Sequence, residues 1–371
     1  MYLEGLKLVN FKNYESQTLE FSPKLNCFVG DNGMGKTNLL DAIHYLCMCK
    51  SHFLIPDRFV VRHEHDFFRI EGMFSRDAKD ELIVCKYKQG DRKVIERNKF
   101  QYDKLSEHVG FLPMVMVCPD DSDLITNGSE IRRKYMDVLL VQSDRLYLNH
   151  LISYNKVLKQ RNAFLKNYSH PDEIDYTLLK VYDLQLIKPA NYIFNKRKLI
   201  LQRLKPIFQE FYNKISGSKE SVDFDYFSFM HEMSLLELLQ ESREKDAWLR
   251  RTTKGIHKDD IKFFIDKYPV KKNASQGQLK SYLLALKLAQ YQLLKEETTV
   301  NPLLLLDDIF DKLDANRVKY LLELLLTCDF GQIFITDTHD RRIIEILNNF
   351  NSGYTQFIVK DGTAKLSLQS I

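Results

Sequence analysis

The chain reads Gly30-Asp31-Asn32-Gly33-Met34-Gly35-Lys36-Thr37 between an apolar run, Leu25–Val29, and a segment of helical periodicity, residues 38–47. A strand, a glycine-rich loop and a helix N-terminus in this order form a phosphate cradle, because the glycines let backbone N–H groups approach an anion closely. In such a cradle the lysine reaches the β- and γ-phosphates, and the hydroxyl after it binds Mg²⁺. The segment therefore predicts nucleotide binding, with Lys36 on the phosphates and Thr37 on the metal.

Composition and charge are those of a globular cytoplasmic protein. Of the 371 residues, 44% are hydrophobic and 28% are charged, and a net charge of only +4 leaves nucleic-acid binding to a local basic patch. The six cysteines lack C-x-x-C and zinc-ligand spacing, which is typical of reduced, mostly buried thiols. Glu4 and Lys7 exclude a signal peptide, and no apolar run approaches the about 18 residues of a membrane span. We expect a soluble, cytoplasmic protein without a membrane partner.

Hydrophobic periodicity predicts an α/β ATPase lobe that an insertion divides. Strand patterns precede the loop at residues 2–11 and 18–21, and period-two alternation over 66–102 predicts an antiparallel β subdomain. From 119 to 273 the pattern is helical without a strict heptad, which favours a compact helical arm over a long coiled coil. The helices expected in this arm span 129–139, 144–166, 174–190, 191–217 and 233–249.

Sheet elements return near the C-terminus. A helix over 279–294 precedes buried strands at 303–306 and 332–336, and residues 354–358 with 366–368 form a closing hairpin. Two further helices are expected over 316–326 and 340–349. Strands at both chain ends indicate a single ATPase lobe with an inserted middle. The expected parts are an N-terminal part, 1–118, a helical lobe, 119–300, and a C-terminal part, 301–371.

Two acids end the strand at 303–306. In a phosphate-loop fold, the acid after a buried strand binds Mg²⁺ beside the loop hydroxyl, which here places Asp307 beside Thr37. The second acid, Asp308, can orient and deprotonate an attacking water as a general base. Because Asp is common at exposed strand ends, the acids indicate ATP hydrolysis only in combination with the loop.

A third segment, Ser275-Gln276-Gly277-Gln278, opens the helix over 279–294 and is called the signature segment below. Ser275 is a suitable N-cap, and capping alone would explain the serine. Ser, Gly and Gln at a helix N-terminus also form an anion site. A second phosphate-binding end in one chain is explained if it contacts the γ-phosphate held by another subunit.

The loop, the signature segment and residues 303–308, followed by Leu313-Asp314, resemble the ATP-binding-cassette (ABC) ATPases. Within these, the chain is similar to the RecF family of SMC-like recombinational repair proteins of bacteria. The similarity is collinear over nearly the whole chain, although Ser51-His52-Phe53 lacks the arginine usual in the family's Ser-Phe-Arg. The segments that carry the resemblance are residues 10–14, 30–43, 119–137, 255–260 and 275–278.

The resemblance implies an ATP-dependent homodimer that holds two nucleotides between its subunits, with ATP and Mg²⁺ as cofactors. Asp308 and Lys36 would be catalytic, Thr37 and Asp307 would bind the metal, and the signature segment would act in trans with Asp314 of the D-loop near the seam. His339 is a candidate γ-phosphate sensor or an ordinary surface histidine. The implied ATP-binding residues are Gly30, Asp31, Asn32, Gly33, Met34, Gly35, Lys36, Thr37, Asn38, Lys12 and Asn13.

In function, the resemblance implies a weak, DNA-stimulated ATPase that binds junctions of single- and double-stranded DNA at gaps. With RecO and RecR it would promote RecA loading, recombinational repair and the SOS response. The DNA surface stays open: basic residues of the arm and of the β subdomain are either a phosphate-binding track or ordinary solvated faces. These candidates are Lys196, Arg197, Lys198 and Arg203 of the arm, and Lys86, Lys88, Arg92, Lys93, Arg97 and Lys99 of the β subdomain.

Other classes of protein share the phosphate loop. In the ATPase subunit of a membrane transporter, the insertion that corresponds to the segment between Thr37 and Ser275 would be much shorter. A long-armed SMC protein would need many more heptad repeats. A small-molecule kinase would not need the signature segment at all. The DNA-repair class therefore fits the sequence best.

Overall fold

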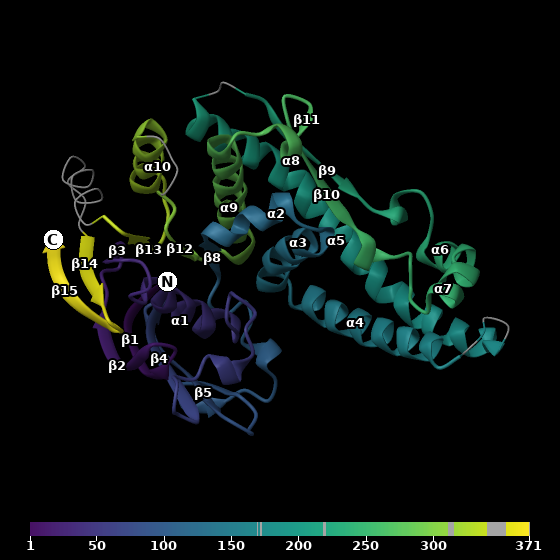
Figure 1. The fold of residues 1–371 in the computed structure, drawn as a ribbon, viewed down its shortest axis with the longest axis horizontal. Coiled ribbons are helices and arrows are strands. Elements are labelled where there is room, and N and C mark those ends of the chain that lie inside the picture. Colours follow the sequence, from purple (N-terminus) through teal and green to yellow (C-terminus); the bar gives the residue numbers. More distant parts are fainter. Residues whose placement is uncertain (169, 171–172, 218–219, 311–314, 340–353, 371) are drawn as a thin grey trace. The chain divides into compact units, whose positions relative to one another are not determined.

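A computed structural model describes the chain except for residues 169, 171–172, 218–219, 311–314, 340–353 and 371 (Figure 1). The chain divides into two compact units. The first unit comprises Met1–Asp121, Lys214–Gly217 and Gln276–Ile371, and the second comprises Ser122–Asn213 and Ser218–Ser275. Among the described residues, no helix combines the length and the apolarity that a bilayer crossing demands.

A mixed sheet of the first unit carries the phosphate loop. Its strand order is β15-β14-β3-β13-β12-β8, in which β15 alone is antiparallel to its neighbour. These strands span Thr363–Ser370 (β15), Tyr354–Lys360 (β14), Leu25–Val29 (β3), Ile333–Asp337 (β13), Leu303–Leu306 (β12) and Met114–Val117 (β8). The buried strands and the closing hairpin expected near the C-terminus are confirmed, whereas β8 was not predicted.

An antiparallel sheet forms the rest of the β structure of this unit, with strand order β2-β1-β4-β5-β6-β7. Its strands span Tyr2–Phe11 (β1), Tyr14–Glu20 (β2), Phe67–Arg76 (β4), Lys79–Lys88 (β5), Val94–Arg97 (β6) and Phe100–Gln101 (β7). The side chains alternate between buried and exposed along β4, as expected for a sheet with one face on the core. The predicted antiparallel subdomain is confirmed, and the N-terminal strands extend it.

Helices α1 (Lys36–Met48), α9 (Gln276–Thr298) and α10 (Ala315–Thr327) belong to the first unit. The boundary expected after residue 300 therefore differs from the structure, where the division falls between Ser275 and Gln276. The reason is that α9 is buried along most of its length and packs beside β8. The helix expected over 340–349 lies outside the described residues.

The second unit is mainly helical. Its helices are α2 (Asp123–Thr126), α3 (Ser129–Ser143), α4 (Arg145–Lys166), α5 (Tyr176–Ser216), α6 (Leu235–Glu241), α7 (Arg243–Leu249) and α8 (Val270–Asn273). Its small sheet has the order β11-β10-β9, with strands Tyr268–Pro269, Asp260–Ile265 and Val222–Phe227. The sequence did not predict this sheet, because its strands are short and the helices α6 and α7 separate β9 from β10.

Two expected helix boundaries are wrong in the second unit. The helices expected over 174–190 and 191–217 are one helix, α5, which continues through Pro189 and Pro206. Proline normally breaks a helix, but the fully buried Leu186, Ala190 and Ile193 hold α5 in place across Pro189. Conversely, the helix expected over 233–249 is interrupted at Ser242, which ends α6 and precedes α7.

Buried ion pairs restrict the candidate DNA surface. Arg197 is 2% exposed and pairs with Asp137 and Asp259 at 2.8 Å, which removes it from any phosphate-binding track. Lys93 of the β subdomain is also mostly buried, at 2.9 Å from an oxygen of Asp57. Burying a charge is tolerated when it is paired, so these residues serve the fold.

Gln332 joins the two sheets of the first unit. Its side chain is buried directly before β13; Nε2 donates to the carbonyl oxygens of Leu3 at 2.8 Å and Ser22 at 2.7 Å. Its Oε1 accepts the Leu3 N–H at 2.7 Å. One amide thus satisfies buried backbone groups of β1, a strand of the other sheet.

We predict that Gln332→Leu lowers the free energy of unfolding by about 2–4 kcal/mol, because buried backbone groups lose their partners. Urea unfolding followed by circular dichroism measures this change. The matched control is Gln292→Leu, whose amide donates to Glu296 at an exposed position of α9; it should change stability by less than about 0.5 kcal/mol. Equal effects of the two changes would contradict the role of Gln332.

Candidate ATP-binding site

The phosphate loop lies between β3 and α1, and its conformation depends on glycine. Gly35 has a φ of 115°, which side-chain-bearing residues rarely adopt, and a Cβ on it would lie 2.4 Å from Asn13 Nδ2. A Cβ on Gly30 would lie 2.2 Å from the Val359 carbonyl oxygen. The Tyr14 hydroxyl donates to the Gly35 carbonyl at 3.0 Å. The close neighbours therefore fix the shape of the loop and exclude larger residues.

Lys36 is folded back onto its own loop. Its Nζ donates to the carbonyl oxygens of Gly30 at 2.6 Å and Asp31 at 2.9 Å. Burial lowers the pKa of Lys36, although the carboxylates of Asp308 and Asp307 act in the opposite direction. Phosphate oxygens are stronger acceptors than carbonyl oxygens, so the ammonium is placed to exchange these partners for a nucleotide.

Thr37 and Asp307 lie together, as the sequence predicted. The Thr37 Oγ1 donates to the Asp307 carboxylate, at 2.9 Å from Oδ1 and 2.8 Å from Oδ2. Asp307 is 4% exposed, and burial raises the pKa of its carboxyl. A hydroxyl and a carboxylate are the hard oxygen ligands that Mg²⁺ prefers. These residues fit the metal chemically, and their metal-binding role stays a prediction.

Thr336, in β13, is a site residue that the sequence analysis missed. Its Oγ1 donates to Asp307 Oδ1 at 2.7 Å and accepts the Asp308 N–H at 2.8 Å. One hydroxyl therefore orients both acids at the end of the neighbouring strand. The available signal was a hydroxyl side chain, Thr336, directly after the apolar run Ile333–Ile335.

Asp308 adopts a left-handed backbone conformation with a φ of 46°. The Asp307 side chain is fixed by two hydroxyls, whereas the Asp308 backbone is fixed through its N–H on Thr336. This conformation turns the chain sharply after β12. The base role of Asp308 stays a prediction.

The asparagines at the loop form a short chain of hydrogen bonds. Asn38 Nδ2 donates to Asn13 Oδ1 at 2.7 Å, and Asn13 Nδ2 donates to the Met34 carbonyl at 3.0 Å. Lys12 points elsewhere, because its Nζ forms an ion pair with the buried Asp41 at 2.7 Å. Asn13 therefore contacts the loop directly, and Lys12 contacts the first helix.

The signature segment forms the N-terminal end of α9. Ser275 and Gln276 are exposed, and the helix begins at Gln276. Arg317 of α10, which the sequence analysis also missed, donates to the Gly277 carbonyl at 2.6 Å and to Ser281 Oγ at 2.5 Å. A guanidinium beside a helix N-terminus adds to the positive potential there, which favours an anion.

Two further residues, His339 and Asp314, were predicted to lie near the nucleotide. His339 is exposed directly after β13, and its backbone N–H donates to Asp337 Oδ1 at 3.1 Å. This position at the end of a parallel strand leaves both interpretations of His339 open. Asp314 of the predicted D-loop lies outside the described residues.

The fold and the site define the class of the protein. The sequence matches the RecF/RecN/SMC N-terminal domain family over residues 2–356. The Smc head domain from Pyrococcus furiosus shares the fold with a TM-score of 0.59 at 16% identity, over 99% of this chain and 96% of that chain. The chain is therefore an ATPase head of the SMC and ABC type.

The chain belongs to the RecF family, as the sequence analysis predicted. It is 46% identical to the DNA replication and repair protein RecF of Parabacteroides distasonis, over 98% of each chain. It is also 46% identical to RecF of Flavobacterium johnsoniae, over 96% of this chain and 99% of that one. The structure of the recombination mediator protein RecF-ATP in the RecFOR pathway has a TM-score of 0.88 at 31% identity, over 99% of this chain and 98% of that chain.

We predict that Thr336→Val lowers the ATP turnover rate by about 10–100-fold while nucleotide binding persists, because both acids lose their orienting hydroxyl. Steady-state phosphate release and nucleotide titration measure the two effects separately. Thr355→Val is the matched control, since the Thr355 hydroxyl is buried in β14 without a hydrogen-bond partner. Unchanged turnover in Thr336→Val, or an equal loss in the control, would contradict this role.

Proposed function

We propose that this chain is an ATP-dependent DNA-binding repair protein whose ATP-bound form is a homodimer. The observation that carries the proposal is that one chain bears two different helix N-termini that are suited to bind phosphate. The loop with Lys36, Thr37 and Asp307 is one, and the exposed N-terminus of α9 beside Arg317 is the other. Two copies in opposite orientation would use both ends on each nucleotide.

Each residue has a chemical task in this proposal. Lys36 neutralises phosphate charge, while Thr37 and Asp307 would hold Mg²⁺, which supplies further positive charge at the phosphates. Asp308 orients the attacking water and accepts its proton. The partner copy's signature segment covers the γ-phosphate with helix N–H groups and side-chain donors. Removal of the γ-phosphate then removes the contact that joins the subunits.

The DNA-related part of the proposal rests on the relatives. They are named DNA replication and repair proteins, and the RecF structure is that of a recombination mediator protein in the RecFOR pathway. By this similarity the chain would act in the cytoplasm as a weak, DNA-stimulated ATPase at junctions of single- and double-stranded DNA. With RecO and RecR, it would promote RecA loading at gaps and SOS induction.

The alternative is an ATPase subunit of a transporter or another SMC-like ATPase. The relatives match this chain over nearly their whole length at 46% identity, insertion included, which favours the repair function. A dimer assay without DNA does not separate these classes, because both are expected to dimerise on ATP. Retention of the ATP-bound dimer on gapped duplex DNA does separate them.

We predict that Asp308→Asn retains bound ATP and accumulates as a dimer, because the variant lacks the proposed base but keeps the loop. Asparagine tolerates the left-handed conformation at this position, which limits damage to the backbone. Turnover should fall by about 100-fold or more. Light scattering with ATP measures the dimer, and a monomeric ATP-bound variant would show that Asp308 has another role.

We predict that Ser275→Arg blocks ATP-driven dimerisation and leaves ATP binding to the monomer within about threefold of the wild type. Arginine is much larger than the exposed serine, so its side chain would occupy the space where the partner's γ-phosphate would lie. Ser367→Arg, at an exposed position of β15, is the control for added surface charge. An intact ATP-dependent dimer in Ser275→Arg would argue against the nucleotide sandwich.

A further inference from the structure

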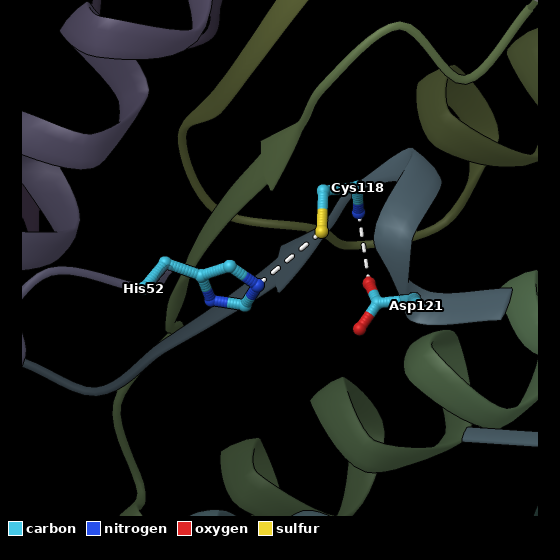
Figure 2. Close-up of side chains that lie close together, drawn as sticks. All are labelled: His52, Cys118 and Asp121. Atoms are coloured by element: carbon cyan, nitrogen blue, oxygen red, sulfur yellow. Dashed lines mark hydrogen bonds between the residues drawn. The ribbon is translucent and has the colours of Figure 1, made fainter. Parts of the chain in front are cut away.

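A cluster of metal-ligand side chains that are not part of the phosphate loop lies in the first unit. His52 belongs to the turn after α1, Cys118 directly follows β8, and Asp121 lies in the short helix Pro119–Ser122. In Figure 2 the His52 imidazole and the Asp121 carboxylate approach Cys118 from two sides. Among the described residues, these three offer ligand atoms that all lie within 4.8 Å of one another.

The spacing is close to that of a tetrahedral metal site. Zn²⁺ with bonds of about 2.3 Å to sulfur and about 2.0–2.1 Å to nitrogen or oxygen holds its ligand atoms about 3.3–3.6 Å apart. His52 Nε2 and Cys118 Sγ are 3.3 Å apart. Only a side-chain adjustment is needed to bring the third ligand within the same range.

The surrounding contacts orient the ligands in the manner of a second coordination shell. The backbone N–H of His52 donates to Asp41 Oδ1 at 2.7 Å, and the His44 ring packs edge-on against the His52 ring. Asp121 Oδ2 accepts the Cys118 N–H at 2.8 Å. A carboxylate has about four acceptor positions, so these contacts leave room for a metal bond.

Two of the three ligands, a thiolate and a carboxylate, would supply the negative charge that a divalent cation needs. Lys287 Nζ lies 2.7 Å from Asp121 Oδ1, and the backbone N–H of Cys118 donates to Asp121 Oδ2, so a metal ion would share the carboxylate with these two partners. On metal binding the thiol proton passes to solvent, and the thiolate and carboxylate offset the ion's charge. Thiolate and imidazole favour zinc over Mg²⁺, so the nucleotide's metal does not compete for this site.

We propose that His52, Cys118 and Asp121 bind a zinc-type transition-metal ion through Nε2, Sγ and a carboxylate oxygen, with water as the fourth ligand. His52 and Asp121 are only partly buried, which leaves that fourth position open to solvent. The carbonyl oxygen of Val117, the residue before Cys118, accepts the Asp307 N–H at 2.8 Å. A bound ion would therefore brace the strand end beside the acid of the ATP site.

The test is zinc binding by the full chain without nucleotide or DNA. After treatment with a chelator and dialysis against Zn²⁺, the wild type should retain one ion per chain by elemental analysis. Cys118→Ser and His52→Ala should each raise the zinc dissociation constant by at least about 100-fold. The control, Cys328→Ser, removes a cysteine outside the cluster and should bind zinc like the wild type.

Cobalt provides a readout that needs no variant. Co²⁺ bound by the wild type should show a thiolate-to-cobalt charge-transfer band and the visible spectrum of a tetrahedral site. Absence of zinc retention and of this band, or unchanged affinity in a folded Cys118→Ser variant, would overturn the proposal. Because the assay contains no nucleotide, its outcome is independent of ATP-driven dimerisation.

Discussion

The hydrogen bonds between the Thr37 hydroxyl and the Asp307 carboxylate connect the phosphate loop to the end of β12, and the ATP site depends on this connection. The two residues are 270 positions apart in the chain. They meet because β3, β13 and β12 are neighbours in one parallel sheet, so that their carboxyl ends lie at one edge. The insertion of the whole second unit between them leaves this edge intact. The sheet therefore assembles the ATP site, because β3 leads into the phosphate loop, β12 ends before Asp307 and β13 contains Thr336.

Charged side chains lie buried at this edge of the sheet. Lys36 and Asp307 are both largely removed from water. Burial lowers the pKa of Lys36 and raises the pKa of Asp307, which favours the neutral form of each. Magnesium would add positive charge beside Asp307 and phosphate would add negative charge beside Lys36, so nucleotide binding and charge compensation are coupled. The Lys36 ammonium rests on two loop carbonyls, which are weaker partners than phosphate. The helix N-terminus of a second chain would add further positive potential.

The sequence predicted the fold class and the contact between Thr37 and Asp307, and it missed several neighbouring residues and helix boundaries. The loop, Asp307 and the antiparallel subdomain each have a local pattern, and the structure places Thr37 and Asp307 in contact. Thr336 and Arg317 were missed because their importance depends on strand and helix neighbours that periodicity does not reveal. The sequence also did not predict the cluster of His52, Cys118 and Asp121, because their spacing in the chain is not that of a zinc finger. Helix α5 was divided in the prediction because burial across Pro189 cannot be read locally.

The central claim is that the phosphate loop is half of an ATP site and that a second copy completes it. The most direct measurement is the mass of the wild-type protein by light scattering, without nucleotide, with ATP, and with ATP and a gapped duplex. The account predicts the 43.8 kDa monomer without nucleotide, twice that mass with ATP, and retention of the dimer on the gapped duplex. A mass that ATP leaves unchanged, under conditions where ATP binding is demonstrated, would contradict the account.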